Sequence, residues 1–194
     1  MSTRDFMVES LARTAAAIST HGYAIQAVGS DCSVPGCNCP PSPRPWAYTI
    51  GLCGRGVPEL LVIGLSDRQA QGVIAHVVET YFDSAELPVG RDQPLAFKGV
   101  PIRLLGAPLR SVAPDRDLLA GWYGYFSSFG PFTPPDVVQI VWADAVGRFP
   151  WQTLFDWRLR PRQPVLEMQP NAMLEPEQPM AWPTSSGRRR GRSR

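Results

Sequence analysis

The sequence predicts an α+β fold, in which a single domain combines a mixed or largely antiparallel sheet with about three packed helices. Three observations lead to this prediction. Segments with helical periodicity alternate with short apolar segments typical of strands, and hairpin-like turns join several of those strands. In addition, 44% of the 194 residues are hydrophobic and six are tryptophan, which supplies a sizeable core and excludes a wholly disordered chain.

The first predicted element is a helix over about residues 3–20. The alanine run at 15–17 favours a helix, and Gly22 suits the left-handed residue that commonly follows the end of one. The residues that recur at helical spacing are Met7, Leu11, Thr14 and Ile18. Residues 23–29 then predict a short strand, in which Tyr23, Ile25 and Ala27 share one face.

Residues 46–52 and 59–65 predict two further strands, joined by the glycine-containing turn 53–58. The clearest helix follows over residues 66–85, where Ser66 and Gln69 match the capping-box pattern. Its apolar stripe, typical of a helix that lies on a sheet, consists of Ala70, Val73, Ile74, Val77, Val78 and Tyr81.

Residues 95–109 predict a hairpin that turns near Lys98-Gly99. Three of its side chains are expected to face the core, namely Val100, Ile102 and Leu104. A third helix is expected over about residues 114–127, with an apolar stripe formed by Leu118, Leu119, Trp122, Tyr123 and Phe126. Residues 136–144 predict a strand that is mostly buried, because its apolar residues are nearly continuous.

Residues 1–162 are predicted to form the domain, with a loop rich in cysteine and proline at 30–45. Residues 163–194 are expected to be largely irregular or disordered after a short docking segment at 163–167. The last seven residues hold five arginines and no acid, whereas residues 1–187 carry 14 basic and 17 acidic side chains. This arginine-rich end could contact nucleic acid, but a solubilising role is favoured.

The sequence also predicts a cytoplasmic protein without a membrane partner. Charged residues at Arg4, Asp5, Glu9 and Arg13 interrupt the N-terminal segment, so it does not resemble a signal peptide. No window approaches the roughly 18 consecutive apolar residues that a membrane span requires. In the cytoplasm, structural disulfides are rare.

Four segments occur in a characteristic order: "HGYAIQAV" (21–28), "WAYTIGL" (46–52), "PELLVIGL" (58–65) and "VVQIVWADAVGRFPW" (137–151). In this order the chain resembles the bacterial DUF4262 family over about residues 10–165. The resemblance implies a small cytoplasmic α+β domain and brings no established activity. Family members often carry histidine where this chain has Val57 and proline where it has Ala143. Any chemical role of that histidine is therefore absent or relocated in this chain.

Four cysteines form the most conspicuous chemical cluster. Cys32, Cys37 and Cys39 lie within eight residues, and Cys53 follows fourteen residues later. Thiolates bind zinc well, so these cysteines predict a zinc site in which Cys53 or His21 completes the ligands of the loop. The spacing departs from that of paired zinc knuckles. Free thiols, or a disulfide that joins Cys37 to Cys32 or Cys39, are the alternatives.

The remaining polar candidates each have a structural alternative. His21, at a predicted helix end, suits a C-terminal cap, and His76 is expected to be a partly exposed surface residue. Asp144, Arg148 and Trp151 could hold a polar ligand, but they also suit a turn that covers the core.

Two functions follow from these observations. The first is a binding or interaction protein, with an unknown small molecule or protein as partner and zinc as the expected cofactor. The alternative is a small-molecule enzyme with a pocket between residues 47–52 and 147–151. The ligand-binding candidates are His21, Tyr48, Glu59, Asp144, Arg148 and Trp151. Glu59 is either a buried acid at a strand start or a solvated rim residue. No nucleophile, metalloprotease or phosphate-binding motif assigns catalytic residues.

Overall fold

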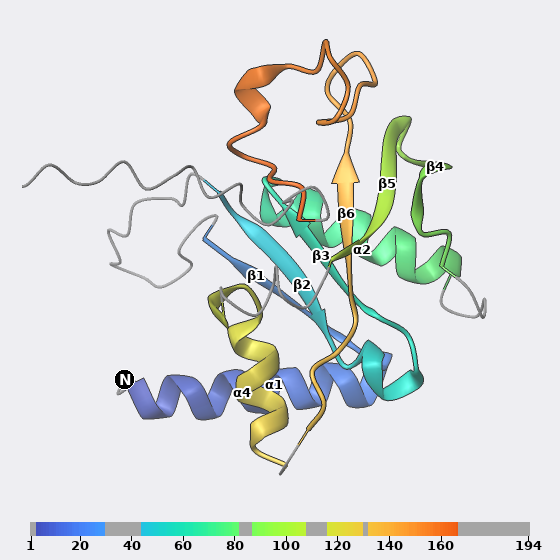
Figure 1. The fold of residues 1–194 in the computed structure, drawn as a ribbon. Coiled ribbons are helices and arrows are strands. Elements are labelled where there is room, and N and C mark those ends of the chain that lie inside the picture. Colours follow the sequence, from blue (N-terminus) through green and yellow to red (C-terminus); the bar gives the residue numbers. More distant parts are fainter. Residues whose placement is uncertain (1–2, 30–43, 82–86, 108–115, 130–131, 167–194) are drawn as a thin grey trace, which may run out of the picture.

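A six-stranded sheet with strand order β1-β2-β3-β6-β5-β4 forms the centre of the protein (Figure 1). The computed structural model describes residues 3–29, 44–81, 87–107, 116–129 and 132–166. The strands are β1 (Ala24–Val28), β2 (Trp46–Ile50), β3 (Glu59–Ile63), β4 (Gly90–Phe97), β5 (Val100–Ala107) and β6 (Val137–Trp142). β3 and β6 pair in parallel, and the other neighbours pair antiparallel. The predicted α+β fold with a mixed, largely antiparallel sheet is confirmed.

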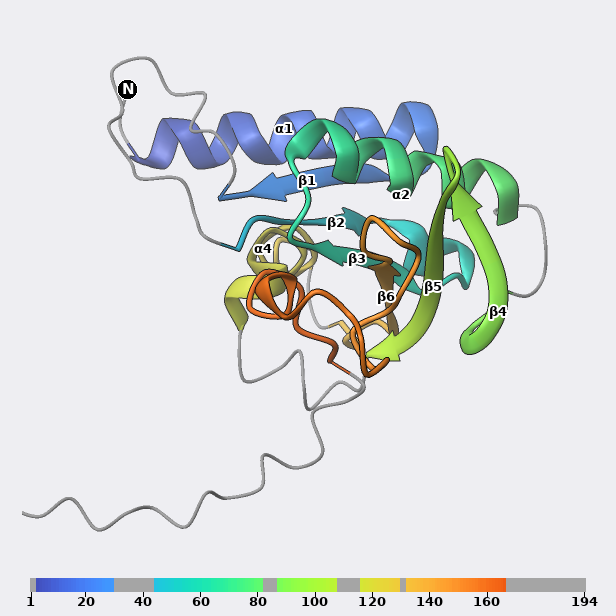
Figure 2. The same ribbon diagram turned by 90° about the horizontal axis from the view of Figure 1, so that it is seen from above.

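Helices cover both faces of this sheet. The elements are α1 (Thr3–His21), α2 (Asp67–Tyr81) and α4 (Ala120–Ser127), with the short 3₁₀ helices η1 (Leu52–Arg55), η2 (Arg116–Leu119) and η3 (Trp157–Leu159). α2 packs on one face, whereas α4 and the segment after β6 pack on the other, and α1 lies beside the edge strand β1 (Figure 2). None of the described helices is long and apolar enough to cross a membrane.

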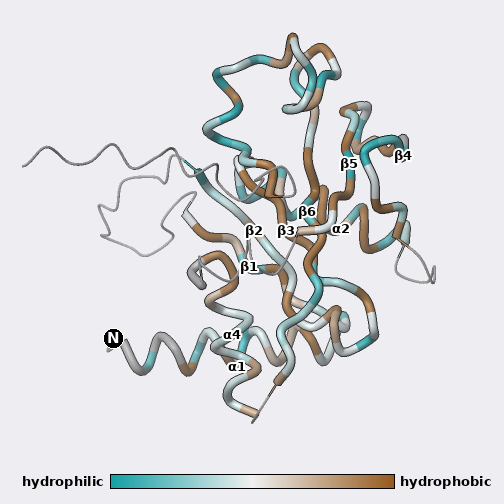
Figure 3. The backbone as a smooth tube through the Cα atoms, viewed as in Figure 1, coloured by the Kyte–Doolittle hydropathy of each residue, from teal (hydrophilic) through white to brown (hydrophobic). Residues whose placement is uncertain are grey.

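The two central strands are almost completely buried. All five residues of β3 are buried, as are the first five of β6, and hydrophobic residues concentrate along both strands in Figure 3. This pattern is expected where parallel strands are covered on both faces. The α2 residues that bury against this sheet are Ala70, Val73, Ile74, Val77 and Val78. The predicted stripe of this helix is therefore confirmed.

Local signals mark several boundaries correctly. α1 ends at His21, and Gly22 follows with φ 85° and donates its N–H to the Ile18 carbonyl at 2.8 Å. The hairpin turns at Lys98 and Gly99, whose φ angles of 49° and 79° match the mirror-image turns that suit twisted strands.

Two expectations need correction. Val100 is predicted to face the core, but it is 44% exposed, because it pairs with Phe97 directly beside the turn that closes the hairpin. Ile102 and Leu104 are buried as expected. The third helix is divided, since a 3₁₀ turn over Arg116–Leu119 precedes the α-helix that begins at Ala120.

Close packing of α4 on the sheet depends on a glycine. The N–H of Gly121 donates to the Tyr48 hydroxyl at 2.8 Å, so a strand side chain satisfies one of the unpaired amides at the start of the helix. A β-carbon at Gly121 would overlap the Gln26 side-chain oxygen and would lie 2.7 Å from the Tyr48 hydroxyl. Both neighbours belong to strands of the sheet, so a larger residue would push α4 outward.

We expect Gly121→Ala to destabilise the protein by about 1–3 kcal/mol, because overpacking displaces α4 from β1 and β2. Urea unfolding monitored by circular dichroism measures this change. Gly124→Ala in the same helix is the matched control, since a β-carbon there meets no atom within 4 Å. The control should raise stability by up to about 1 kcal/mol through helix propensity. Equal effects of the two variants would contradict the packing argument.

Candidate functional site

The Glu59 side chain lies fully buried at the start of β3. Its carboxylate accepts hydrogen bonds from the Thr49 hydroxyl at 2.5 Å and the Gly51 amide at 2.8 Å. The Cys53 amide and the Trp122 indole N–H each donate at 3.2 Å. These donors come from β2, the β2–β3 connection and α4. One carboxylate therefore joins three parts of the fold.

The β2–β3 connection is shaped to supply these donors. Gly51 adopts φ 114°, a conformation that favours glycine, and this turns the chain into η1 so that two amides face Glu59. The Thr49 hydroxyl donates to Glu59 and accepts the Leu60 amide at 2.8 Å. Of the two alternatives for Glu59, the buried acid at a strand start is the one observed.

Two weak acids beside this cluster stay neutral near pH 7. Cys53 is half-buried, and burial together with the nearby Glu59 charge raises the pKa of its thiol to about 11. Burial likewise raises the pKa of Tyr48 to about 12, although backbone hydrogen bonds from Gly121 and Trp122 partly oppose that rise. A protonated thiol is a poor nucleophile and a poor metal ligand. The arrangement therefore favours stability over acid–base or nucleophilic chemistry.

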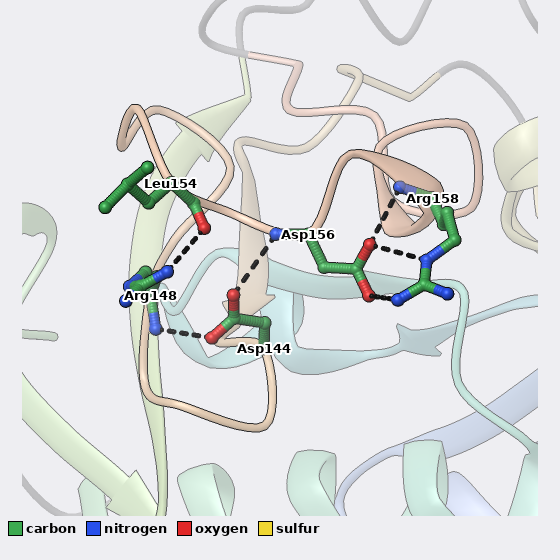
Figure 4. Close-up of polar contacts among 5 residues, drawn as sticks. All are labelled: Asp144, Arg148, Leu154, Asp156 and Arg158. Atoms are coloured by element: carbon green, nitrogen blue, oxygen red, sulfur yellow. Dashed lines mark hydrogen bonds and ion pairs between the residues drawn. The ribbon is translucent and has the colours of Figure 1, made fainter.

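A second polar cluster surrounds Asp144, immediately after β6. One carboxylate oxygen accepts the amides of Arg148 at 2.8 Å and Val146 at 3.0 Å, and the other accepts the Asp156 amide at 3.2 Å. The Arg148 guanidinium donates instead to the Leu154 carbonyl at 2.8 Å (Figure 4). Asp144 therefore holds together two turns that are twelve residues apart.

These contacts lower the pKa of Asp144. Burial alone would raise the pKa, but the amides of Arg148, Asp156 and Val146, together with the positive charge of Arg148, outweigh it. Asp156 in turn accepts the Arg158 amide at 3.1 Å and pairs with its guanidinium at 3.0 Å on the exposed side of the cluster. These hydrogen bonds and the positive charge of Arg158 lower the pKa of Asp156.

Trp151 is engaged by internal ring contacts. Its ring stacks on Phe149 with a centroid distance of 4.9 Å and an interplanar angle of 5°. The Arg91 guanidinium lies 5.2 Å from the Trp151 centroid, and that of Arg103 lies 4.6 Å from the Phe149 centroid. These contacts between cations and rings attach the segment after β6 to β4 and β5.

Two buried glutamines attach the end of the described chain. The Gln163 amide bonds both the N–H and the carbonyl of Trp142, at 2.8 and 2.9 Å, and so imitates a neighbouring strand. From β6, Gln139 donates to the Pro164 carbonyl at 2.7 Å and accepts the Leu166 amide at 2.9 Å. Sequence reasoning missed both glutamines, because an isolated polar residue carries no signal of its distant partner. The contacts of Thr49 and Trp122 with Glu59 were likewise not predicted, although Trp122 was expected in the apolar stripe of the third helix.

The predicted ligand-binding residues divide into separate groups. Tyr48 and Glu59 contact α4. Asp144, Arg148 and Trp151 lie in the segment after β6, whose buried Phe149 packs with Leu105 of β5 and Val141 of β6. His21 is exposed at the end of α1.

The predicted metal ligands are described only in part. Cys32, Cys37 and Cys39 lie outside the described residues, whereas Cys53 lies beside Glu59 as a free thiol. The described part of the chain contains no group of three or more His, Cys, Asp or Glu residues arranged to hold a metal ion.

Three large apolar side chains point to solvent from the chain around Asp144. We call residues 144–160 the Asp144 segment. Its exposed apolar residues are Val146, Leu154 and Trp157, with exposed fractions of 69%, 68% and 73%. The Leu154 side chain points away from the Asp144 carboxylate (Figure 4). A fixed segment that exposes apolar side chains is a candidate contact surface.

We expect Glu59→Gln to lower the free energy of unfolding by about 2–3 kcal/mol, because an amide nitrogen replaces an acceptor that faces several donors. Urea unfolding measures the loss. Glu79→Gln, at an exposed position of α2, should change stability by less than about 0.5 kcal/mol. A loss no larger than that of the control would show that Glu59 does not organise the cluster.

Asp144 predicts a specific dependence of stability on pH. Its pKa is lower in the folded protein, so its stabilising effect is complete above the ordinary value of 3.8 and is lost as pH falls through the lower folded value. Wild type should therefore exceed Asp144→Asn in stability by a constant margin at neutral pH, and the margin should shrink below about pH 4. Urea unfolding across acid pH measures the margin. A margin independent of pH would contradict this assignment.

Comparison with known proteins identifies the family of this chain. Neither a search of curated proteins nor a search of solved structures finds a significant match. The family model DUF4262, described as a domain of unknown function, matches residues 17–156. The matched range runs from the end of α1 to Asp156 and so includes both the Glu59 cluster and most of the Asp144 segment. The chain belongs to the DUF4262 family.

Proposed function

We propose that this protein is a binding or interaction protein that engages its partner through the Asp144 segment. The observation that carries the proposal is the exposure of Val146, Leu154 and Trp157 on a segment held by one buried carboxylate. A tryptophan exposed to water lacks the favourable free energy that burial of its side chain would provide. Tryptophan is also enriched among the residues that dominate binding energy at protein interfaces.

The fixed geometry of the segment supports the same proposal. Asp144 accepts three backbone amides, and Arg148 ties its own turn to the Leu154 carbonyl. Gln163 then attaches the following chain to the end of β6. A surface ordered before binding loses less conformational entropy when a partner docks. Hydrogen bonds of this kind therefore raise affinity without touching the partner.

The enzyme alternative receives less support from the geometry. Glu59 spends both carboxylate oxygens on internal donors, and the Cys53 and Tyr48 side chains are protonated near neutral pH. A general base needs a free lone pair and a pKa near the working pH. Asp144 also accepts backbone amides, so both acidic candidates make hydrogen bonds that stabilise the fold.

We further propose that the cysteine loop binds zinc in a cytoplasmic protein. Cys32, Cys37 and Cys39 supply three close thiols, and a reducing compartment keeps them available. Cys53 is the weaker fourth ligand, because burial and Glu59 oppose the loss of its proton. His21 is the other fourth ligand that the sequence offers.

Selection from a library of random short peptides tests the interaction proposal. Peptides that bind wild type should lose about tenfold or more in affinity for Trp157→Ala, because this change removes the largest exposed apolar contact. Fluorescence anisotropy measures the affinities, and melting temperatures verify folding. Val89→Ala changes another exposed apolar residue outside the Asp144 segment and should leave binding intact. A selection without any Trp157-dependent peptide would refute the proposal.

Elemental analysis of purified protein tests the zinc proposal. We expect about one zinc per chain, lost in the double variant Cys37→Ser/Cys39→Ser together with part of the stability. Cys53→Ser should retain zinc if His21 supplies the fourth ligand and lose it if Cys53 does. Metal-free wild type with a melting temperature equal to that of the double variant would exclude the site.

A further inference from the structure

We propose that the partner of the Asp144 segment is an acidic polypeptide segment that also carries apolar side chains. This inference rests on the proposed function and names the chemistry of the partner. It follows from the charges that accompany the exposed apolar residues and from the kinds of side chain among them.

Arginines accompany the exposed apolar side chains along the sequence. Residues 144–162 contain four arginines and two aspartates, with no lysine or glutamate. Both aspartates accept backbone amides, and Asp144 is nearly fully buried, so little negative charge faces a partner. Arg158 and Arg160 follow Trp157 closely in the chain, and both are exposed. In Figure 4, Arg148 and Arg158 lie on opposite sides of the Asp144–Asp156 contact. Carboxylates of a partner would complement this surface.

The apolar residues favour a polypeptide over a nucleic acid. Val146 and Leu154 are aliphatic and offer no ring on which a base could stack, so Trp157 is the one exposed aromatic of the three. The Asp156 carboxylate already pairs with the Arg158 guanidinium at 3.0 Å, which reduces the charge that Arg158 offers to a phosphate and to a carboxylate alike. The aliphatic and indole groups suit apolar side chains of a partner, and the guanidinium groups suit its carboxylates. One polypeptide segment can carry both kinds of side chain.

The arginine-rich C-terminus of this chain is not a complementary occupant. Its last seven residues carry five arginines and no acid, so they would repel the Asp144 segment. A polypeptide with acidic side chains therefore fits the surface better than these seven residues.

The composition of the selected peptides tests this inference. Among peptides whose binding depends on Trp157, aspartate and glutamate should be enriched together with leucine, isoleucine or aromatic residues. Arg160→Glu should weaken the affinity of such a peptide about tenfold at low salt, and by less at high salt, because screening reduces the lost attraction. Arg68→Glu makes the same charge change at an exposed position of α2, on the other face of the sheet, and should not weaken binding.

Each outcome bears on one of the two proposals. Trp157-dependent peptides without acidic enrichment would overturn the acidic partner and leave the binding function in place. Tighter binding of a single-stranded DNA oligonucleotide than of any selected peptide would assign the surface to nucleic acid and overturn this inference. The absence of Trp157-dependent peptides would overturn both. Equal losses of affinity for Arg160→Glu and Arg68→Glu would show that only the net charge of the protein matters, and would overturn the inference of an acidic partner.

Discussion

The fold depends most on a single buried carboxylate. Removing an acidic group from water is costly unless hydrogen-bond donors replace its hydration, and Glu59 receives such donors from a strand, a turn and a helix. One hydroxyl, two backbone amides and one indole N–H from these elements find their acceptor at this side chain. Apolar packing brings these elements together, but hydrophobic contacts lack direction and so do not fix one arrangement. The carboxylate then selects one arrangement among the many that packing alone would allow.

The same principle orders the segment after β6, which has little regular structure. After β6 the described chain contains one short 3₁₀ helix, yet Asp144, Gln139 and Gln163 supply the hydrogen bonds that a strand or helix would otherwise make. Side chains that imitate peptide groups let the backbone change direction freely while its polar groups remain paired. Such a segment can present exposed residues in a fixed geometry without presenting a sheet edge. That combination suits recognition by a partner and limits uncontrolled strand pairing.

The sequence is informative where the signal is local. The stripe of α2, the glycine after α1 and the Lys98-Gly99 turn depend on neighbours within a few residues, and the structure confirms them. The predicted burial of Val100 was wrong, because burial depends on how far the elements that cover the sheet extend, which local sequence does not show. The role of Glu59 stayed open because its indole donor lies 63 residues away, and spacing does not show which side chain faces it. The glutamine contacts of the last segment were not predictable for the same reason. Three of the four predicted metal ligands lie outside the described residues, so the zinc site stays a prediction.

The position of β6 has a consequence for the order of folding. This strand lies between β3 and β5, and it pairs Val137 with Glu59, 78 positions earlier in the chain. During synthesis, β1, β2, β3 and α2 can associate through contacts between near neighbours, whereas the centre of the sheet stays incomplete until β6 emerges. Until then β3 exposes an apolar edge with unpaired peptide groups, which is the kind of surface that chaperones bind and that drives aggregation. The last strand in the sequence is thus the one that joins both halves of the sheet, so the sheet can be completed only after β6 has been synthesised.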